Sequence, residues 1–424
     1  MKRVLVIAYY FPPLGMGGVR RVVNFCRYLP EFGWNPLVLT VKPIRYFTYD
    51  PELMKEIECE VQRSESADPL RIMRILNIGK EFDNIRSRSQ ELSNFLFIPD
   101  NKIGWLPFAV SKGIQMIKDV DVILATAPPY TGLLIGCMLK RINGVPLVVE
   151  FRDPWPYWSY ATLFHKRVNE WLKRRVLNLS DAIISVNEPI KASLWSLVSG
   201  LKSQVTVIPS GWSPEVMTSP DDFRFETEKP DKFTIVYTGS FIPPRTPVYF
   251  LKALSGLISE GKIKPNDIRV ELIGFSQGET IIKELELEEI VRVESYRPHR
   301  YCVERLKKAD LLWVMIDEVE KASTGKIGEY LGARKPILAT VPEGPCADII
   351  RETKSGIVVP PRDIEAIKEA IYDFYLKFKR GKLESPLEEE VKEYSWVKLT
   401  GRLAQIFDNL ATEIHKKNQK NVDK

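Results

Sequence analysis

The stretch VLVIAYYFPPLGMGG at residues 4–18 decides the fold of the first half of the chain. Its first six residues form a continuous apolar run, which is typical of a central parallel strand covered on both faces. A loop rich in proline and glycine follows, and apolar residues then recur at helical spacing from Val19 to Leu29. Residues 36–40 (PLVLT) predict the next strand. The right-handed crossover of this strand–helix–strand unit places the glycine loop at the carboxyl edge of the sheet.

The glycine loop offers a way to bind a phosphate. Gly15, Gly17 and Gly18 let the backbone approach an anion closely, and the following helix supplies unpaired N–H groups. A glycine turn at a tight strand–helix junction is the alternative interpretation. A dinucleotide-dependent oxidoreductase is disfavoured, because Arg20 stands where that fingerprint has its third glycine. The second strand also ends in LTVK, without an acidic residue to hold a ribose.

The alternation of strands and helices continues and then restarts after a linker. Ten further strands are predicted at 122–126, 147–151, 182–186, 205–208, 233–239, 268–273, 290–293, 311–316, 336–340 and 357–359. The segment 209–232 is rich in Ser, Pro, Asp and Glu, as is typical of a linker. We therefore predict an α/β protein of two Rossmann-like β/α/β domains facing across a cleft, at 1–215 and 216–393. A long helix at 394–415, followed by a fraying charged tail, is predicted to pack back on the first domain.

Composition and charge exclude several classes of protein. The 424 residues are 44% hydrophobic and 27% charged, which excludes wholesale disorder, and no window approaches the ~18 apolar residues needed to cross a bilayer. Five scattered cysteines predict a reduced, cytoplasmic chain without a disulfide framework or a zinc cluster.

Charge is distributed unevenly between the two halves. Residues 1–215 hold 27 basic and 20 acidic residues, whereas the rest of the chain holds 34 and 35. The basic half favours an anionic partner such as phosphate or lipid headgroups, with a chance surface bias as the alternative. No nucleic-acid recognition motif is present, so no nucleic acid is expected as a partner.

The second half carries a candidate site for a ribose and a diphosphate. The strand FTIVYTG runs into SFIPPR, which puts Arg245 at the mouth of the second sheet. A short helix is predicted to begin near Lys326, with Glu329 one turn inside it, after a turn made of Ser323, Thr324 and Gly325. A carboxylate there can accept two hydrogen bonds from a ribose diol, while the two cations neutralise a diphosphate. Each residue alone is typical of a solvated surface charge, but their repetition at one sheet edge favours a binding site.

The chain resembles retaining glycosyltransferase family 4, the "glycosyl transferase group 1" proteins of bacterial and archaeal polysaccharide synthesis. The matching stretches are YYFPPLGMGGVRR, YLPEFGWNPLVLT, IPDNKIGWLPFA, ATAPPY, VVEFRDPW, VIPSGW, VYTGSFIPPR and GKIGEYLGARKPILAT. The resemblance spans nearly the whole chain. It implies the GT-B fold, a nucleotide-sugar donor bound mainly by the C-terminal domain, and transfer with retention of the anomeric configuration.

The resemblance also implies roles for individual residues. Glu329 matches the second glutamate of the Glu-x7-Glu signature, which contacts the ribose, and Arg245 matches the basic residue that meets the diphosphate. Asp153, in RDPW, falls in the acceptor-side region. The predicted catalytic residues are therefore Asp153, Arg245, Lys326 and Glu329. The predicted donor contacts are Gly17, Gly18, Arg21, Gly239, Arg245, Pro298, Ser323, Thr324, Gly325, Lys326 and Glu329.

Two positions depart from the family pattern. Lys321 stands where the first glutamate of the signature, which touches the donor sugar, is expected. Glu320 would substitute for it if the loop shifts by one residue. Ser240 stands where many relatives carry arginine, which leaves Arg245 with more of the phosphate charge.

Three other features have competing interpretations. The motif Asp119-Val120-Asp121 spells a metal-binding DxD, but it precedes an apolar strand where such residues are commonplace, so neither a metal nor another cofactor is expected. His299 follows a segment that holds the nucleotide base in relatives, yet a surface histidine is the favoured interpretation. The aromatic group at 155–160 precedes the basic stretch HKRVNEWLKRR at 165–175. It suits an anionic membrane surface, stacking against the acceptor, or a helix packed through Val168, Trp171 and Leu172.

The sequence thus predicts a metal-independent, retaining glycosyltransferase that uses a nucleotide sugar and a glycan or lipid-linked acceptor. It is expected in the cytoplasm, with peripheral attachment to the inner face of the membrane left open. The alternatives are a non-catalytic GT-B homologue that acts as a scaffold or regulator, and a GT-B nucleotide-sugar epimerase.

Overall fold

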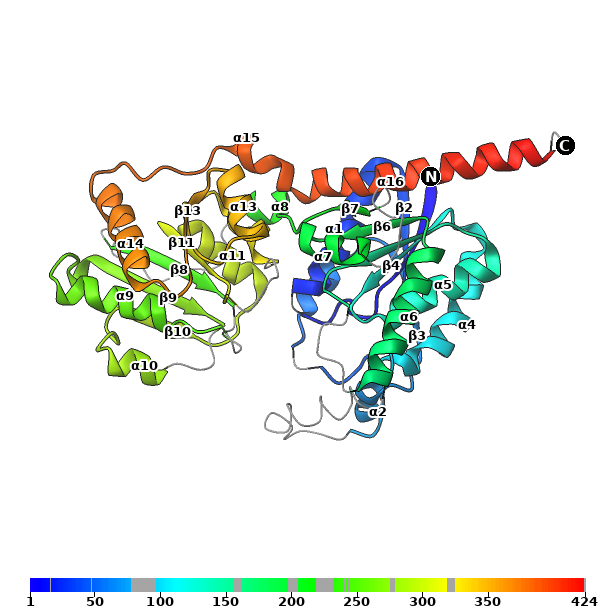
Figure 1. Ribbon diagram of the computed structural model, residues 1–424, viewed down its shortest axis with the longest axis horizontal. Helices are drawn as coiled ribbons and strands as arrows, with labels where there is room; N and C mark the ends of the chain where they lie inside the picture. The colour runs from blue at the N-terminus through cyan, green and yellow to red at the C-terminus, as the bar shows by residue number, and fades with distance from the viewer. Residues whose placement is uncertain are drawn as a thin grey trace. The chain divides into compact units, whose positions relative to one another are not determined.

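The computed structural model describes residues 1–15, 17–46, 48–77, 97–155, 162–196, 205–218, 232–239, 241, 245–274, 279–318 and 325–422 (Figure 1). The chain divides into two compact units. Unit 1 comprises Met1–Pro209 together with Leu399–Lys424, and unit 2 comprises Ser210–Lys398.

Unit 1 is built on a seven-stranded parallel sheet in the order β3-β2-β1-β4-β5-β6-β7. The strands are β1 Lys2–Ile7, β2 Trp34–Val41, β3 Glu60–Ser64, β4 Val122–Ala127, β5 Leu147–Phe151, β6 Ala182–Ser185 and β7 Val205–Val207. The apolar run of β1 is fully buried from Val4 to Ile7, because the strand lies in the interior of the sheet between β2 and β4. The chain leaves every strand at the same edge of the sheet, where loop side chains gather.

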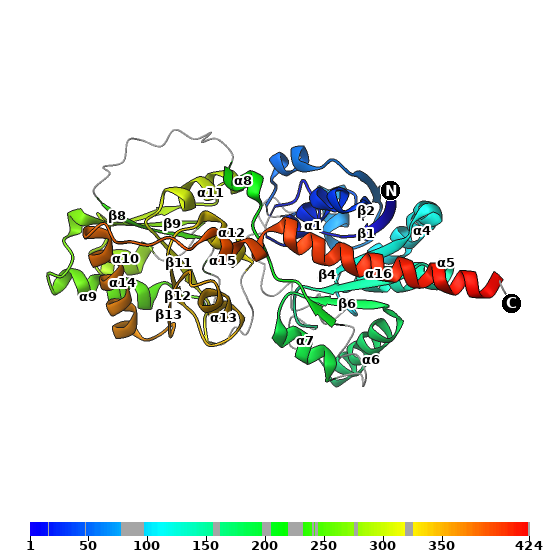
Figure 2. The ribbon, with the colours of Figure 1, turned by 90° about the horizontal axis from the view of Figure 1, so that it is seen from above.

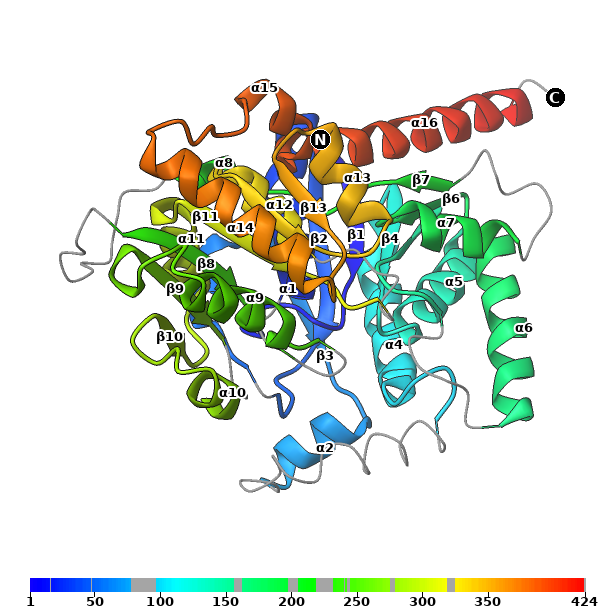
Figure 3. The ribbon, with the colours of Figure 1, turned by 60° about the vertical axis from the view of Figure 1, so that its left-hand side comes forward.

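Helices and short 3-10 turns connect these strands. They are α1 Gly17–Tyr28, η1 Leu29–Phe32, η2 Pro51–Glu56, α2 Pro69–Ile75, η4 Ile103–Trp105, α4 Leu106–Met116, η5 Ile117–Asp119, α5 Thr131–Asn143, α6 Leu163–Leu179 and α7 Glu188–Trp195. Figure 3 shows α6 at the outer edge of unit 1, beside α5.

Helix α16 (Trp396–Val422) belongs mostly to unit 1, although it follows unit 2 in the sequence. The Phe407 ring packs edge-on against Trp34 with ring centroids 5.2 Å apart, and Lys2 Nζ lies 2.8 Å from Asp408 Oδ1. Figure 2 shows the helix extending along this unit. The helix continues to Val422, so the predicted end near position 415 is wrong. One apolar stripe against the β1–β2 region fixes its first half.

Unit 2 repeats the architecture with a six-stranded parallel sheet in the order β10-β9-β8-β11-β12-β13. The strands are β8 Phe233–Thr238, β9 Ile268–Ile273, β10 Val291–Glu294, β11 Leu311–Met315, β12 Ile337–Thr340 and β13 Gly356–Val359. The helices are α8 Pro214–Thr218, α9 Val248–Ser259, η7 Pro265–Asp267, α10 Glu279–Glu284, α11 His299–Lys308, α12 Lys326–Ala333, α13 Pro345–Glu352, α14 Ile364–Lys379, α15 Glu388–Val391 and η8 Lys392–Tyr394.

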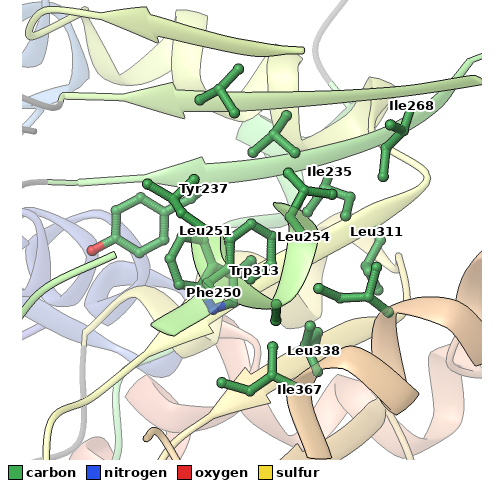
Figure 4. Packing of buried hydrophobic residues seen from close by; sticks show 14 of the residues in the cluster. Ile235, Tyr237, Phe250, Leu251, Leu254, Ile268, Leu311, Trp313, Leu338 and Ile367 are labelled. Atoms are coloured by element: carbon green, nitrogen blue, oxygen red, sulfur yellow. The ribbon is translucent and has the colours of Figure 1, made fainter. Parts of the chain in front are cut away.

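Two hydrophobic layers sandwich the sheet of unit 2. One layer packs α9 and α14 against the strands, and the other packs α8, α11, α12 and α13 against the opposite face. Figure 4 shows the centre of the first layer, where the rings of Phe250 and Trp313 stack with centroids 3.9 Å apart. The ring of Tyr237, at the carboxyl end of β8, lies 5.1 Å from Trp313. A rigid aromatic cluster therefore fixes the edge of the sheet where β8 ends.

The boundary between the units falls at Pro209/Ser210, six residues before the predicted end of the first domain. The residues after this boundary contact unit 2. Trp212 Nε1 donates to the Val391 carbonyl oxygen at 3.1 Å, and its ring lies against Gly332 of α12. The first part of the predicted linker is therefore packed structure, and most of the rest (219–231) lies outside the described residues.

Every predicted strand is present, with ends within two residues of the prediction. The α/β class and the two Rossmann-like units are thereby confirmed. Strand β3 was missed because it lies at the edge of its sheet and its sequence, EVQRS, has no apolar run.

Candidate functional site

The ammonium group of Lys326 lies at the carboxyl end of β8 in unit 2. Lys326 is the first residue of α12, and its Nζ donates to the Tyr237 hydroxyl at 3.2 Å. The same Nζ lies 4.6 Å from the centroid of the Tyr237 ring, within cation–π range. Because the Tyr237 ring is held by the Trp313 cluster, the cation has a defined position at the sheet edge.

Gly239, directly after β8, makes room for this ammonium. Its N–H donates to the Ile273 carbonyl oxygen at 2.7 Å, so the ends of β8 and β9 lie together. A Cβ on Gly239 would lie 1.7 Å from Lys326 Nζ, and the φ angle of +129° is also unfavourable for other residues. Glycine at 239 is therefore required for Lys326 to reach this place.

Helix α12 is held close to the sheet and to the chain at the unit boundary. The Thr238 N–H donates to the Tyr330 hydroxyl at 3.0 Å. A Cβ on Gly328 would lie 2.5 Å from the backbone of Gly211. The glycine spacing in GKIGEYLG thus serves close packing, and it fixes the start of α12 relative to β8.

Glu329 lies in the first turn of α12 and faces the start of α11. Its Oε1 is 2.7 Å from His299 Nε2, and the two side chains are 22% and 14% exposed. The carboxylate therefore has a fixed partner on one oxygen. We did not predict this pairing, because the two residues are 30 positions apart and belong to different helices.

The remaining predicted residues of unit 2 lie at the same sheet edge or outside the described residues. Pro298 precedes α11, Gly325 precedes α12, and Arg245 lies half-buried just before α9. The residues outside the described part of the chain are Ser240, Glu320, Lys321, Ser323 and Thr324.

In unit 1, Arg152 draws three elements together at the edge where the glycine loop lies. It follows β5, and its Nη2 donates to the Pro128 carbonyl oxygen at 2.7 Å, while its Nη1 donates to the Gly18 carbonyl oxygen. A Cβ on Gly18 would lie 2.7 Å from Arg152 Nη1. Gly17 is the first residue of α1. This supports the tight-junction interpretation of the glycine loop, and Arg152 is a positioning residue that the sequence analysis missed.

Arg21, predicted as a donor contact, is buried within unit 1. Its Nε donates to Glu150 Oε1 at 2.7 Å, and its two terminal nitrogens donate to the carbonyl oxygens of Ile208 and Pro209 at 2.8 and 2.7 Å. The side chain is only 3% exposed, and burial lowers the pKa of Arg21 while Glu150 opposes that shift. Arg21 therefore ties α1 to β5 and to the end of β7, and its role as a donor contact stays a prediction.

A pocket of about 160 Å³ opens at the same edge of unit 1. Asp153, Asn101, Lys102 and Tyr10 line it, together with the Pro128–Tyr130 turn. Burial raises the pKa of the Asp153 carboxyl, an effect that Arg152 partly offsets. The residues that line the pocket thus include a carboxyl, an amide and a hydroxyl group.

Two other sequence features have structural explanations. Trp155 is buried and stacks on Tyr130 with centroids 4.6 Å apart, and its Nε1 donates to Asn169 at 2.9 Å, so this one ring of the aromatic group does not lie at the surface. Residues 156–161 lie outside the described residues. Asp121 accepts a hydrogen bond from the Arg3 N–H at 2.7 Å at the start of β4, away from the carboxyl edge.

Comparison with known proteins identifies both halves of the chain. Residues 16–216 match the model of glycosyltransferase family 4, and residues 219–390 match the model of glycosyl transferases group 1. No curated protein sequence matches the chain significantly.

Solved structures share the fold over nearly the whole length. A glycosyltransferase from Rickettsia africae aligns with a TM-score of 0.65 at 15% identity, covering 96% of this chain and 98% of that one. Anabaena HepE, solved with UDP and glucose, aligns with a TM-score of 0.64 at 14% identity, covering 96% and 100%. Sucrose-phosphate synthase from Thermosynechococcus elongatus aligns with a TM-score of 0.65 at 16% identity, covering 97% and 100%. The alignments show the GT-B fold, and the two family matches together show that the chain belongs to the glycosyltransferases, with a family 4 N-terminal part and a group 1 C-terminal part.

Proposed function

We propose that this glycosyltransferase moves a sugar from a nucleoside-diphosphate sugar to a hydroxyl of a glycan or lipid-linked acceptor, with retention and without a metal ion. The observation that carries the proposal is that the first turn of α12 carries both a cation and a carboxylate, Lys326 and Glu329. Lys326 Nζ is fixed at the end of β8, and Glu329 stands three residues further along the same helix.

The donor's diphosphate and ribose each have a suited partner in this arrangement. The Lys326 ammonium and the N–H groups that begin α12 supply positive charge for the diphosphate, and Arg245, which precedes α9, is proposed to add to it. The Glu329 carboxylate accepts hydrogen bonds from ribose hydroxyls. As the bond from the anomeric carbon to the phosphate oxygen breaks, the charge that develops on the diphosphate is stabilised by these groups. The UDP found in the Anabaena HepE structure supports this class of donor.

The pocket of unit 1 suits the acceptor. Asp153, Asn101 and Tyr10 line it, and these side chains recognise hydroxyl groups. The raised pKa of Asp153 makes its carboxyl a better proton acceptor at neutral pH than an ordinary aspartate. For the configuration to be retained, the acceptor's hydroxyl oxygen forms the new bond to the anomeric carbon on the face from which the diphosphate departs, and its proton passes to the Asp153 carboxylate.

The donor site is tested by thermal unfolding with UDP, GDP, ADP and their sugars. A ligand at a hundred times its Kd stabilises by about 2.7 kcal/mol, which is roughly 5–10 °C for a unit of this size. For the nucleotide with the largest effect, we expect Lys326→Met to retain about half of that shift or less. Gly239→Ala is expected to reduce the nucleotide-induced shift as much as Lys326→Met does, because the new Cβ displaces the Lys326 ammonium.

The double variant Gly239→Ala/Lys326→Met is expected to keep as large a nucleotide-induced shift as Lys326→Met alone, since both changes remove the same interaction. Lys262→Met is the matched control, because this lysine pairs with Glu260 at the surface. If Lys326→Met kept the full nucleotide-induced shift in unfolding temperature, the proposed site would be contradicted. If no nucleotide stabilises the wild type, or if an epimerised nucleotide sugar is the only product, the proposed function is wrong.

We also propose that α6 rests on an anionic membrane. Leu163, Phe164 and Trp171 are 76%, 67% and 55% exposed, so the alternative in which Trp171 packs inward is wrong. Arg167 and Arg175 share this face at helical spacing, and the Arg175 guanidinium lies 5.3 Å from the Trp171 ring centroid. Exposed apolar rings beside cations suit the headgroup region of a bilayer. Within the described residues, no helix combines the length and the apolar character needed to span a bilayer.

Sedimentation with vesicles tests this surface. We expect the protein to bind vesicles of phosphatidylcholine with phosphatidylglycerol more tightly than phosphatidylcholine alone. Arg167→Glu/Arg175→Glu is expected to weaken binding at least tenfold, because each basic residue near the surface contributes about 1 kcal/mol. Lys377→Glu/Lys382→Glu makes the same change of charge on exposed positions of unit 2 and serves as the control. If both double variants lost vesicle binding equally, net charge, and not α6, would govern the binding.

A further inference from the structure

The pairing of His299 with Glu329 is not required by the fold of either helix. His299 begins α11 and Glu329 lies in the first turn of α12, and the 2.7 Å contact between Nε2 and Oε1 joins the two helix starts. The two side chains are 14% and 22% exposed, so water competes weakly for the bond.

The chemistry of the two groups fixes the direction of the hydrogen bond. An ionised carboxylate has only acceptor sites, so the hydrogen must be carried by His299 Nε2. The bond occupies one lone-pair direction of Oε1 and leaves the rest of the carboxylate for a ligand. His299 Nδ1 is buried and has no hydrogen-bond partner among the described residues. The tautomer and the ring orientation are therefore set by Glu329 alone within that part of the chain.

The bond also restricts the carboxylate. A glutamate side chain has three rotatable bonds, and immobilising it costs about 1.5–2 kcal/mol of conformational free energy. If His299 holds the side chain before the ligand arrives, this cost is met in the free protein and does not reduce the affinity of binding.

The neighbouring charged groups are engaged elsewhere. On the segment before α11, Arg297 Nε donates to Glu294 at 2.8 Å, and the Tyr301 hydroxyl donates to the same carboxylate. On α12, Lys326 is held by Tyr237.

We propose that His299 is a positioning residue that holds the Glu329 carboxylate ready to accept the two ribose hydroxyls of the donor. The inference rests on the proposed function, because it takes Glu329 as the group that binds the ribose. It assigns to His299 a side-chain role, whereas the sequence favoured a surface histidine without one.

The test compares His299→Ala with His299→Gln. Gln carries an amide N–H₂ at a reach similar to imidazole Nε2 and can restore the donor, whereas Ala cannot. We expect His299→Ala to raise the donor KM about tenfold or more with kcat nearly unchanged, because a ribose contact is present in both the ground state and the transition state. His299→Gln is expected to recover most of that loss.

The specific readout is discrimination between ribose and deoxyribose. Affinity is measured for UDP, GDP and ADP and for their 2′,3′-dideoxy forms, using the base that binds the wild type best. We expect the ratio of the two affinities to fall at least several-fold in His299→Ala. Tyr301→Phe is the matched control, since it removes a hydrogen bond from the same helix without touching Glu329. Its ratio is expected to equal that of the wild type.

The outcomes distinguish a failure of the proposed ribose site from a failure of the positioning role of His299. If the wild type does not discriminate against the dideoxy forms, or if Glu329→Gln keeps the full discrimination, the proposed ribose site itself is wrong. If Glu329→Gln loses the discrimination but His299→Ala keeps it, the ribose site stands and the positioning role of His299 is overturned.

Discussion

Glu329→Gln is expected to lower kcat/KM for the donor by about 10²–10⁴-fold while leaving thermal unfolding nearly unchanged. A hydrogen bond to a charged group contributes about 1.5–3 kcal/mol, and two ribose hydroxyls are within the capacity of one carboxylate. Each 1.36 kcal/mol corresponds to a tenfold change in rate. Gln keeps the shape of the side chain and one acceptor oxygen for His299, but its N–H₂ cannot accept a hydrogen bond.

The measurement is steady-state release of nucleotide from the donor, with and without acceptor. Glu388→Gln is a matched control, because this carboxylate is 70% exposed and pairs with Arg334 on the surface of unit 2. Its rate is expected to stay within about twofold of the wild type. A Glu329→Gln variant with the activity of the control would exclude Glu329 from the donor site.

Arg21→Met is expected to destabilise unit 1 by about 3–5 kcal/mol, a large share of the 5–15 kcal/mol typical of a folded domain. The change leaves the Glu150 carboxylate buried without its cationic partner, and it also removes the donors to Ile208 and Pro209. Thr126 Oγ1 still donates to Glu150 at 2.6 Å, but a neutral hydroxyl does not balance a buried charge.

Hydrogen exchange of peptides from β1 and β4 reports the opening of unit 1 separately from unit 2. The double variant Arg21→Met/Glu150→Gln is expected to be more stable than Arg21→Met alone, because it removes the unpaired charge. Lys2→Met breaks an exposed pair with Asp408 and is expected to cost less than about 1 kcal/mol. If Arg21→Met cost no more than this control, the buried pair would have no structural role.

The buried ion pair of Arg21 shows what reasoning from the sequence could not predict. The position follows a glycine loop in a basic stretch, and one linear sequence gives no means to see that Glu150 lies opposite it. The two residues are 129 positions apart and meet because β1 and β5 flank β4 in one sheet. The sequence alone does not distinguish a buried arginine from a phosphate-binding arginine, because both can stand in the same local sequence context.

The prediction of helix α12 shows where such reasoning succeeded. The start of α12 at Lys326 and the place of Glu329 one turn inside it are as predicted, because the pattern GKIGEYLGA encodes one helix. The position of the Lys326 ammonium against Gly239 was not predictable, since it depends on the aromatic cluster around Trp313. The donor role of these residues remains a prediction.

The sequence by itself determined the alternation of apolar strands and amphipathic helices, and with it two parallel sheets with their loops at one edge. That information is local, because burial on both faces of a strand requires a continuous apolar run and burial of one helix face requires a period near 3.6 residues. Only the tertiary structure decided which partners the side chains of the predicted sites have within the protein. Arg21 is neutralised by Glu150, Trp155 is buried against Tyr130, and Glu329 is oriented by His299. The energy of a charge depends on its surroundings, and those are assembled from segments far apart in the chain.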